Sequence, residues 1–273
     1  GGLSNLNLDM SQVYDYRENA KGIFSGPFSY ALSFTAFSAA PFLLAYALYL
    51  NRISYIVVAT FIIVMLFAFT GHKFMLVSSV MIAAGYLLFL FRVNARRRWF
   101  YWGAALPVAI ATSMSYLPQY EIVGSLFVRR IFFVPAQLNF IYYDFFSEAG
   151  HTYLSALLPF IELKPFAVDY GLAIGKFSGH EGANASNGFL ATSYMHFGIW
   201  GMMAFSLIVG ILIKGLDSLV RNENQSMFVV CASIVSYRVM LVELDLTTAL
   251  LTGGVFLTLI LLWLMLRSID SAH

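Results

Sequence analysis

Cysteine is almost absent from this sequence: Cys231 is the only one among 273 residues. A single thiol cannot form a disulfide bond within the chain, and it excludes zinc and iron–sulfur sites that are built from several cysteines. Because Cys231 lies in the apolar run MFVVCASIV, we interpret it as a small buried side chain. Charge is scarce as well: 11% of the residues are charged, and the formal net charge of +2 is too small to indicate a nucleic-acid-binding protein.

The sequence also lacks an initial methionine and a signal peptide. It opens with Gly1 and Gly2, and a polar stretch follows where a signal peptide would have a basic segment and then an apolar one. We therefore expect that this chain begins partway through a longer protein.

Apolar residues are what the sequence has in abundance. Hydrophobic residues account for 60% of it and aromatic residues for 17%, and the mean hydropathy is +0.76. These values indicate an all-α, polytopic integral membrane protein, in which each helix needs about 20 apolar residues to cross the bilayer. Segments of about this length predict the spans Tyr30–Leu50, Ile53–Thr70, Phe74–Phe91, Trp99–Leu117, Gly198–Ile213, Met227–Val242 and Thr247–Leu266. We expect Pro41 to kink the first of them.

The basic loop RVNARRR, from Arg92 to Arg98, sets the expected orientation. Lys and Arg concentrate in cytoplasmic loops, so we place this loop in the cytoplasm. Counting spans from there puts both ends of the region 118–197 on the outer side of the membrane. The chain then divides into an outer loop (1–29), a bundle of about four spans (30–117), an outer-facing region (118–197) and about three spans with a cytoplasmic tail (198–273).

The segment Glu121–Glu148 is apolar enough to enter a membrane, yet it contains charged residues. As a helix it would place Arg130, Gln137 and Asp144 seven residues apart, on nearly one face. Pro135, in its middle, would bend this helix. Because the outer-facing region must begin and end on the same side, we expect the segment to dip into the membrane and return, or to be completed by a short following run.

Arg129 and Arg130 are the main candidates for ligand binding in this segment. Guanidinium groups at membrane depth are costly unless they face a water-filled cavity or an anion. By the expected topology, nearly as many Lys and Arg residues lie outside as inside, which the positive-inside rule alone does not explain. An anionic ligand at the outer face would explain both features, because the arginine fork matches phosphate oxygens. The alternative is that both side chains extend to the lipid headgroups.

The long polar connection 148–197 is the second source of candidates. Asn187 precedes Gly188–Phe197, where it would cap a helix whose free N–H groups could bind an anion. Tyr194, seven residues on, falls on the same face of that helix. The alternative is a purely structural cap, since capping is common at helix starts without any function.

Three histidines also lie in this connection: His151, His180 and His196. They lack a metal-binding spacing such as HExxH, so we predict no metal site. His151 is the nearest of them in sequence to the paired arginines, and we interpret it as a general base. The other two are interpreted as ordinary polar contacts.

Several strings of the sequence resemble, in order, those of one known family. They are VYDYRENA at Val13–Ala20, TGHK at Thr70–Lys73, RRIFFVPA and YYDFF within Arg129–Phe146, HTYLS at His151–Ser155 and NASNGFLATSYMHFG at Asn184–Gly198. Together they extend over nearly the whole chain, which therefore resembles the O-antigen polymerase (Wzy) family of bacterial oligosaccharide repeat-unit polymerases. Members of that family typically have more spans than this sequence, so the resemblance implies a further helical bundle before residue 1.

The resemblance implies a GT-C-like, multi-pass helical bundle in the bacterial inner membrane, with a re-entrant or broken helix and with loop helices that face the periplasm. The enzyme would be a membrane-embedded glycosyltransferase that polymerises repeat units carried on undecaprenyl diphosphate. It would transfer the growing glycan from its lipid diphosphate to a sugar hydroxyl of the next lipid-linked unit. A chain-length regulator (polysaccharide co-polymerase) and a flippase are the implied protein partners, and neither a nucleic acid nor a cofactor is expected.

The resemblance also implies roles for individual residues. The roles are diphosphate binding by Arg129 and Arg130 with Lys73 and Arg17 assisting, orientation of sugar hydroxyls by Asn187, Tyr143 and Tyr194, and base catalysis by His151 or Asp144. Displacement of a diphosphate requires neutralisation of its charge, which these cations would supply without a metal ion.

Two other functions remain open. The related O-antigen ligase uses the same donor but transfers the glycan to the lipid A core, and strings such as RRIFFVPA favour the polymerase over it. A flippase would move the lipid-linked sugar without any chemistry. Against a transporter, the sequence contains no inverted internal repeat and no matched pair of broken helices in two halves.

Overall fold

The computed structural model describes residues 27–70, 74–94, 105–106, 108–110, 112–114, 116–117, 129, 133–155, 169–180, 182 and 184–271. All regular elements in these ranges are helices. The helices that are long and apolar enough to cross a membrane are Phe28–Tyr49, Phe189–Ser218, Asn224–Val242 and Leu246–Ser268. The protein is thus an all-α, polytopic membrane protein, as the sequence predicts. Two further expected spans are shorter apolar helices, Ile53–Ala68 and Phe74–Leu90.

The chain forms two compact units. The first consists of Gly1–Leu90, Lys214–Val239 and Thr248–His273, and the second consists of Phe91–Ile213 and Met240–Thr247. Each unit therefore combines segments that are far apart in the sequence.

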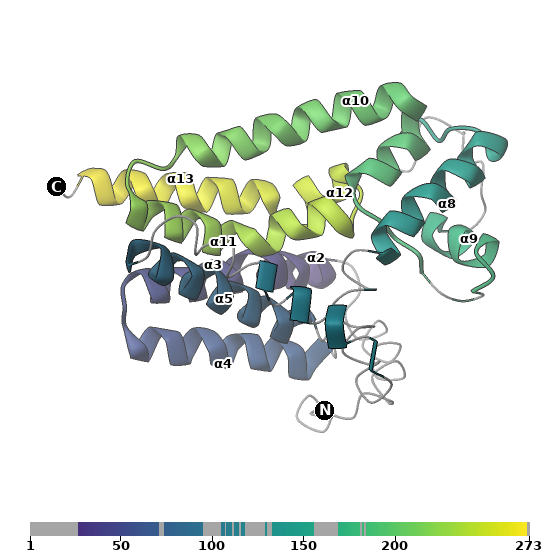
Figure 1. Ribbon diagram of the computed structural model, residues 1–273. Coiled ribbons are helices and arrows are strands. Elements are labelled where there is room, and N and C mark those ends of the chain that lie inside the picture. The colour runs from purple at the N-terminus through teal and green to yellow at the C-terminus, as the bar shows by residue number, and fades with distance from the viewer. Residues whose placement is uncertain are drawn as a thin grey trace. The chain divides into compact units, whose positions relative to one another are not determined.

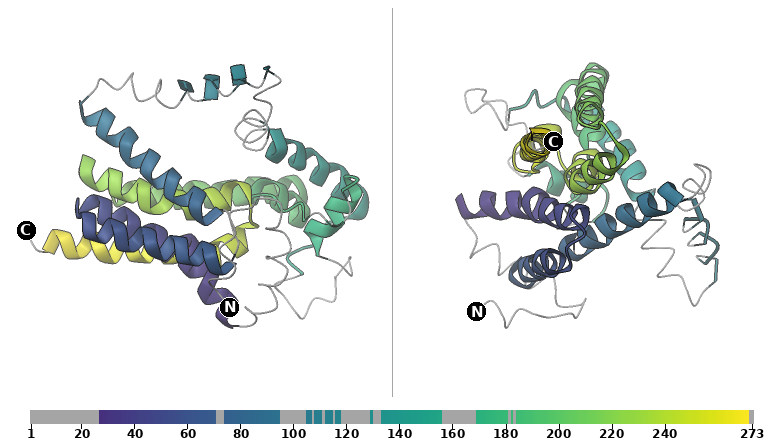
Figure 2. Two further views of the ribbon diagram at one scale, coloured as in Figure 1. Left: turned by 90° about the horizontal axis from the view of Figure 1, so that it is seen from below. Right: turned by 90° about the vertical axis from the view of Figure 1, so that its left-hand side faces the viewer.

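The first unit is a helical bundle (Figures 1 and 2). Its helices, in whole or in part, are α2 (Pro27–Phe34), the π-helical turn η2 (Thr35–Ala39), α3 (Ala40–Tyr49), α4 (Ile53–Thr70), α5 (Phe74–Asn94), α11 (Glu223–Val242), α12 (Leu246–Leu250) and α13 (Val255–Ser271). Figure 1 shows α11 and α13 running lengthwise, and the right-hand view of Figure 2 shows both end-on. A hydrogen bond of 3.1 Å between the hydroxyls of Ser236 and Thr258 joins these two helices.

Aromatic rings form the centre of this bundle. Phe228 of α11 is fully buried, and the rings of Phe42, Tyr46 and Tyr49 lie around it at centroid distances of 5.4, 5.9 and 5.2 Å. Edge-to-face and tilted arrangements at these distances are the favourable ones for aromatic pairs. The pattern of one central ring and three partners on α3 fixes α11 against α3.

The distortion expected at Pro41 is present. The helix before Pro41 widens into the π-helical turn η2, and Pro41 occupies the first turn of α3. A proline lacks an N–H group, and its ring clashes with the carbonyl four residues earlier, so the preceding turn must change its hydrogen bonding.

The span expected over Thr247–Leu266 is present as the candidate Leu246–Ser268, but its helix is interrupted. A turn at residues 251–254 divides this stretch into α12 and α13. Gly254 has a φ of 79°, and a Cβ there would lie 2.7 Å from the Cβ of Ser38. The close approach lets the hydroxyls of Ser38 and Thr258 form a hydrogen bond of 2.8 Å. Only glycine fits both the backbone angle and the contact.

The second unit contains α8 (Val134–Ala149), α9 (Tyr170–Phe177) and most of α10 (Phe189–Ser218), and Figure 1 labels all three. Tyr142 and Phe146 of α8 pack with Ile174 of α9 and with Met195 of α10 in one buried cluster. The hydroxyl of Tyr142 also donates a hydrogen bond of 3.1 Å to the carbonyl of Ala185. These contacts position α8 and α9 around the first half of α10.

Of the helix expected over Glu121–Glu148, the structure describes α8 and the π-helical residues 129 and 133. The other residues of this segment before Phe133 are outside the described ranges, so the full expected helix stays a prediction. Pro135 lies in the first turn of α8. Proline fits there because an N–H group in the first turn has no partner within the helix. Of the expected polar stripe, Gln137 and Asp144 lie exposed on α8, and Arg130 is outside the described residues.

α10 has a break where the sequence predicts a helix end and a new span. Phe197 and Gly198 have non-helical backbone angles, and Gly198 adopts φ 63° and ψ −149°. The latter combination is essentially restricted to glycine. The expected division into Gly188–Phe197 and Gly198–Ile213 is therefore confirmed, and Figure 1 shows α10 bent at this place.

Candidate active site

The turn His151–Ser155 is attached to α10 just before the break. Its backbone N–H groups at Thr152 and Tyr153 donate to the carbonyls of Met195 and His196, over 3.0 and 3.2 Å. Carbonyls at the end of a helical segment are those that need partners from outside the helix. The break in α10 therefore provides acceptors that hold the turn in place.

The turn itself has a strained backbone. Tyr153 and Leu154 have φ values of 48° and 59°, in the left-handed region that residues other than glycine seldom adopt. Such a conformation persists only where the surrounding structure holds it. Here the N–H of Leu154 donates to Nδ1 of His196 over 3.3 Å, and the N–H of Ser155 donates to the carbonyl of Thr152 over 2.9 Å.

His196 connects this turn to an acidic residue through a buried polar network. Its Nδ1 lies 2.6 Å from the hydroxyl of Thr152, and its Nε2 lies 3.5 Å from Oδ1 of Asp245, which follows α11. The N–H of Leu154 can only donate, so Nδ1 must accept and carries no hydrogen. The hydrogen of the neutral imidazole is therefore on Nε2, the nitrogen that lies near Asp245.

The carboxyl group of Asp245 is held in its ionised form. Burial raises the pKa of Asp245, but hydrogen bonds from His196, Thr247 and Thr192 outweigh the burial and leave the pKa below its ordinary value. Thr152 and His196 are almost inaccessible, at 0% and 3% exposure. The network therefore lies beneath the surface, and its role is to hold the turn rather than to touch a ligand.

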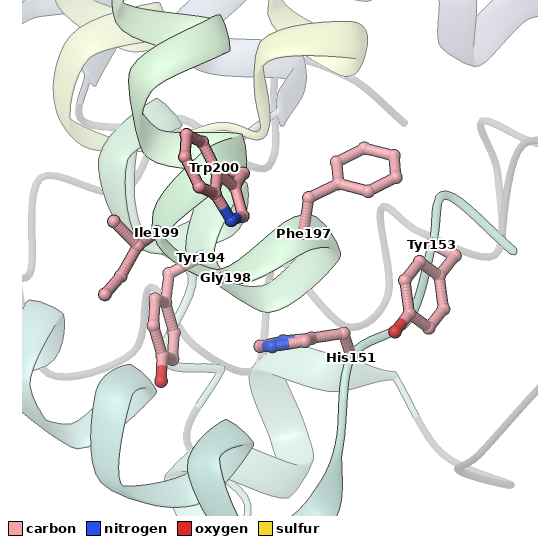
Figure 3. A pocket seen from close by; sticks show the side chains of 7 residues that line it. All are labelled: His151, Tyr153, Tyr194, Phe197, Gly198, Ile199 and Trp200. Carbon is pink, nitrogen blue, oxygen red and sulfur yellow. The ribbon is translucent and has the colours of Figure 1, made fainter.

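The side chain of His151, at the start of the turn, points into an open pocket of about 540 Å³. The pocket is lined by His151, Tyr153, Tyr194, Phe197, Gly198, Ile199 and Trp200. Figure 3 shows the imidazole of His151 between Tyr194 on one side and Tyr153 on the other. Both pairs are edge-to-face, with ring centroids 5.5 and 6.2 Å apart. Pockets of this size are typical of sites for small ligands.

Gly198 allows the imidazole of His151 to occupy this position. A Cβ at Gly198 would lie 2.9 Å from Nε2 of His151, closer than real contacts of this kind. The break in α10 thus has a second consequence, since it brings a residue without a side chain against the ring.

Nδ1 of His151 is buried and has no hydrogen-bond partner among the described residues. A buried polar atom without a partner costs about 1–3 kcal/mol, so native proteins seldom contain one without a reason. The imidazole of His151 nevertheless belongs to the pocket lining, and an imidazole nitrogen that meets a ligand hydroxyl can take its proton, which is general-base chemistry.

Asn187 is placed where the sequence predicts a helix cap, but it is buried, with 3% exposure. Its side-chain oxygen accepts from the N–H of Gly188 over 3.0 Å. Its amide group donates to the carbonyl of Pro135 and to Oδ1 of Asn139, both over 3.1 Å. Asn187 therefore joins the start of α10 to the start of α8, and its polar atoms are already occupied.

Two tyrosines expected to contact sugar lie close together. Tyr194 lines the pocket, and the ring of Tyr143 packs against it with a centroid distance of 5.0 Å. Tyr143 is exposed and does not itself line the pocket. The structure thus brings Tyr194 next to His151, with Tyr143 behind it.

The expected charged residues that the structure describes, Asp144 and Arg129, are not part of the pocket lining. Asp144 is exposed on α8, and Arg129 is exposed as well. Arg17, Lys73 and Arg130 lie outside the described residues. The roles expected for these residues stay predictions.

Several residues of the site carry no signal in the sequence. Thr152 and Asp245 gain their importance only through His196, which is distant from both along the chain. Trp200 reads as an ordinary aromatic residue of an apolar span, yet it is 77% exposed at the pocket. The Phe-Gly step at residues 197–198 was the one available signal, because glycine after a predicted helix marks its end.

Comparison of the chain with models of known protein families, with curated proteins and with solved structures finds no match.

Proposed function

We propose that the protein is a membrane-embedded glycosyltransferase that polymerises oligosaccharide repeat units carried on undecaprenyl diphosphate. It acts at the periplasmic face of the bacterial inner membrane, on a lipid-linked donor and a lipid-linked acceptor. A chain-length regulator and a flippase are its proposed partners.

One observation supports this proposal most strongly. Two of the strings that resemble the polymerase family, HTYLS and NASNGFLATSYMHFG, are separate in the sequence, yet hydrogen bonds join them. Their junction forms the pocket in which the imidazole of His151 lies. The parts of the chain that carry the resemblance are therefore the parts that build a site with a candidate base.

The proposed reaction assigns His151 to the acceptor. A sugar hydroxyl of the acceptor gives its proton to the imidazole of His151 while its oxygen attacks the anomeric carbon of the donor glycan. A bond between this oxygen and the carbon forms, and the bond between the carbon and the lipid diphosphate breaks. The diphosphate leaves with the electron pair, and Arg129 and Arg130, assisted by Lys73 and Arg17, neutralise its charge.

The test is incubation of the purified full-length protein with lipid-linked repeat units, followed by mass spectrometry of the products. We expect products that grow in multiples of one unit, and we expect His151→Ala and Arg130→Ala each to abolish this growth. His180→Ala is the matched control, because His180 is exposed and does not line the pocket.

Other outcomes contradict the proposal in different ways. Transfer of a glycan in one step to lipid A core, without growth in repeat units, would identify a ligase. An unchanged substrate mass together with movement of the lipid-linked sugar across the vesicle membrane would identify a transporter. Normal growth with His151→Ala would remove His151 from the reaction.

A further inference from the structure

The described residues that line the pocket at the break in α10 are mostly aromatic, and none of them is Lys, Arg, Asp or Glu. Four of them, Tyr153, Tyr194, Phe197 and Trp200, carry aromatic rings. A diphosphate moved into such surroundings would lose its hydration without gaining a charged partner, which is costly. The described lining residues therefore suit an uncharged part of a ligand.

The same lining does contain polar atoms for a hydroxylated ligand. The imidazole of His151 is part of the described lining and is a titratable polar group. The indole nitrogen of Trp200 lies on the side of its ring that faces the pocket in Figure 3. A ligand that matches the pocket thus has apolar faces for the rings and at least one hydroxyl for the imidazole.

Two of the aromatic rings in the lining are exposed, so a ligand could stack on them. Trp200 is 77% exposed and Tyr153 is 48% exposed, whereas Tyr194 is buried. Sugar rings combine a face of C–H groups with hydroxyls at the edge, and such a face packs well on an aromatic ring. A hydrocarbon chain would also pack there, but it would offer no polar group to the imidazole of His151.

We propose that this pocket is the subsite for the acceptor sugar: an uncharged sugar ring stacks on Trp200 and Tyr153, with one hydroxyl on the imidazole of His151, while the lipid diphosphate binds elsewhere. This inference rests on the proposed function and adds to it the place and the chemical class of the acceptor group. It also makes Trp200 a residue on which the affinity for the acceptor depends.

The probe for this subsite is the free oligosaccharide released from lipid-linked repeat units by mild acid, which carries neither lipid nor diphosphate. Its binding to the purified full-length protein is measured by isothermal titration calorimetry. We expect Trp200→Leu to weaken the binding about tenfold and Trp200→Phe to weaken it less, because phenylalanine retains a stacking ring. Trp263→Leu is the matched control, since Trp263 is an exposed tryptophan of α13 outside the pocket.

A parallel titration with undecaprenyl diphosphate without sugar tests the other occupant. We expect its affinity to be the same for the wild type and for Trp200→Leu. The inference is wrong if the oligosaccharide binds Trp200→Leu as tightly as the wild type. It is also wrong if Trp200→Leu weakens the lipid diphosphate and not the oligosaccharide, because the pocket would then hold the lipid.

The two proposals fail separately. If the oligosaccharide binding depends on Trp200 but no elongation occurs, the subsite stands as a sugar site and the polymerase reaction does not. If elongation occurs and the KM for the acceptor is unchanged in Trp200→Leu, the reaction stands and the subsite is wrong.

Discussion

The imidazole of His196 is neutral at the centre of its network, because the N–H of Leu154 occupies Nδ1 and the hydrogen is on Nε2, the nitrogen near Asp245. A neutral donor requires an acceptor, and that acceptor need not be charged. The negative charge of Asp245 is therefore less important for this contact than its oxygen atoms.

This arrangement predicts different outcomes for two substitutions at Asp245. Asp245→Ala leaves the buried Nε2–H group of His196 without a partner and should lower the free energy of unfolding by about 1–3 kcal/mol. Asp245→Asn keeps an oxygen that accepts from Nε2 and should lower it by clearly less. Thermal unfolding in detergent measures both. Equal losses in the two variants would indicate that His196 carries a positive charge.

The backbone conformation of Gly198 and its close contact with His151 both exclude a side chain at this position. Gly198→Ala places a side chain on a φ of 63° and within 2.9 Å of Nε2 of His151. We expect a lower unfolding temperature and loss of elongation, because either the backbone or the imidazole must move. Gly210→Ala is the control in the same helix, since a Cβ there meets nothing within 4 Å. That control should be neutral or slightly stabilising, and equal effects of the two substitutions would contradict the assignment.

At the scale of the elements, the junction of α8 with α10 depends on one amide group. Asn187→Asp retains the oxygen that accepts from Gly188 but loses both donated bonds, to Pro135 and Asn139. We expect a loss of about 1–3 kcal/mol in the free energy of unfolding, measured by thermal unfolding. If the variant unfolds like the wild type but binds the released oligosaccharide less well, Asn187 contacts the sugar, as the resemblance implies.

The sequence predicts the helices better than the breaks within them. Most apolar segments correspond to helices, and the end of the helix before Gly198 was predictable because a glycine follows a capped, periodic stretch. The break before α13 was missed because Gly254 lies in an apolar run, and only its contact with Ser38 makes the turn necessary.

The residues of the site also fall into those that the sequence predicts and those that it does not. Residues within one segment, such as His151 and Tyr194, could be selected as candidates from their type and position. Asp245 could not be selected from the sequence, because α11 and the turn after it bring it close to His196. No local sequence pattern indicates such a contact.

At the scale of the whole molecule, the expected orientation in the membrane is testable with thiols. Cys231 is buried and is the only cysteine, so Cys231→Ser gives a background without thiols. Lys176 of α9 and Asp217 of α10 are both exposed and suit the introduction of single cysteines. We expect a membrane-impermeant maleimide to label Lys176→Cys in intact spheroplasts and Asp217→Cys only after permeabilisation. Labelling in the reverse order would overturn the topology.

The break in α10 has a mechanical consequence. One candidate span both crosses the bilayer and, through the carbonyls of Met195 and His196, grips the turn that carries His151. Lipids with longer tails change the tilt of a helix that is anchored in them. Two backbone hydrogen bonds join the turn that carries the imidazole to this helix. A change of membrane thickness that tilts the helix should therefore also change the position of the imidazole.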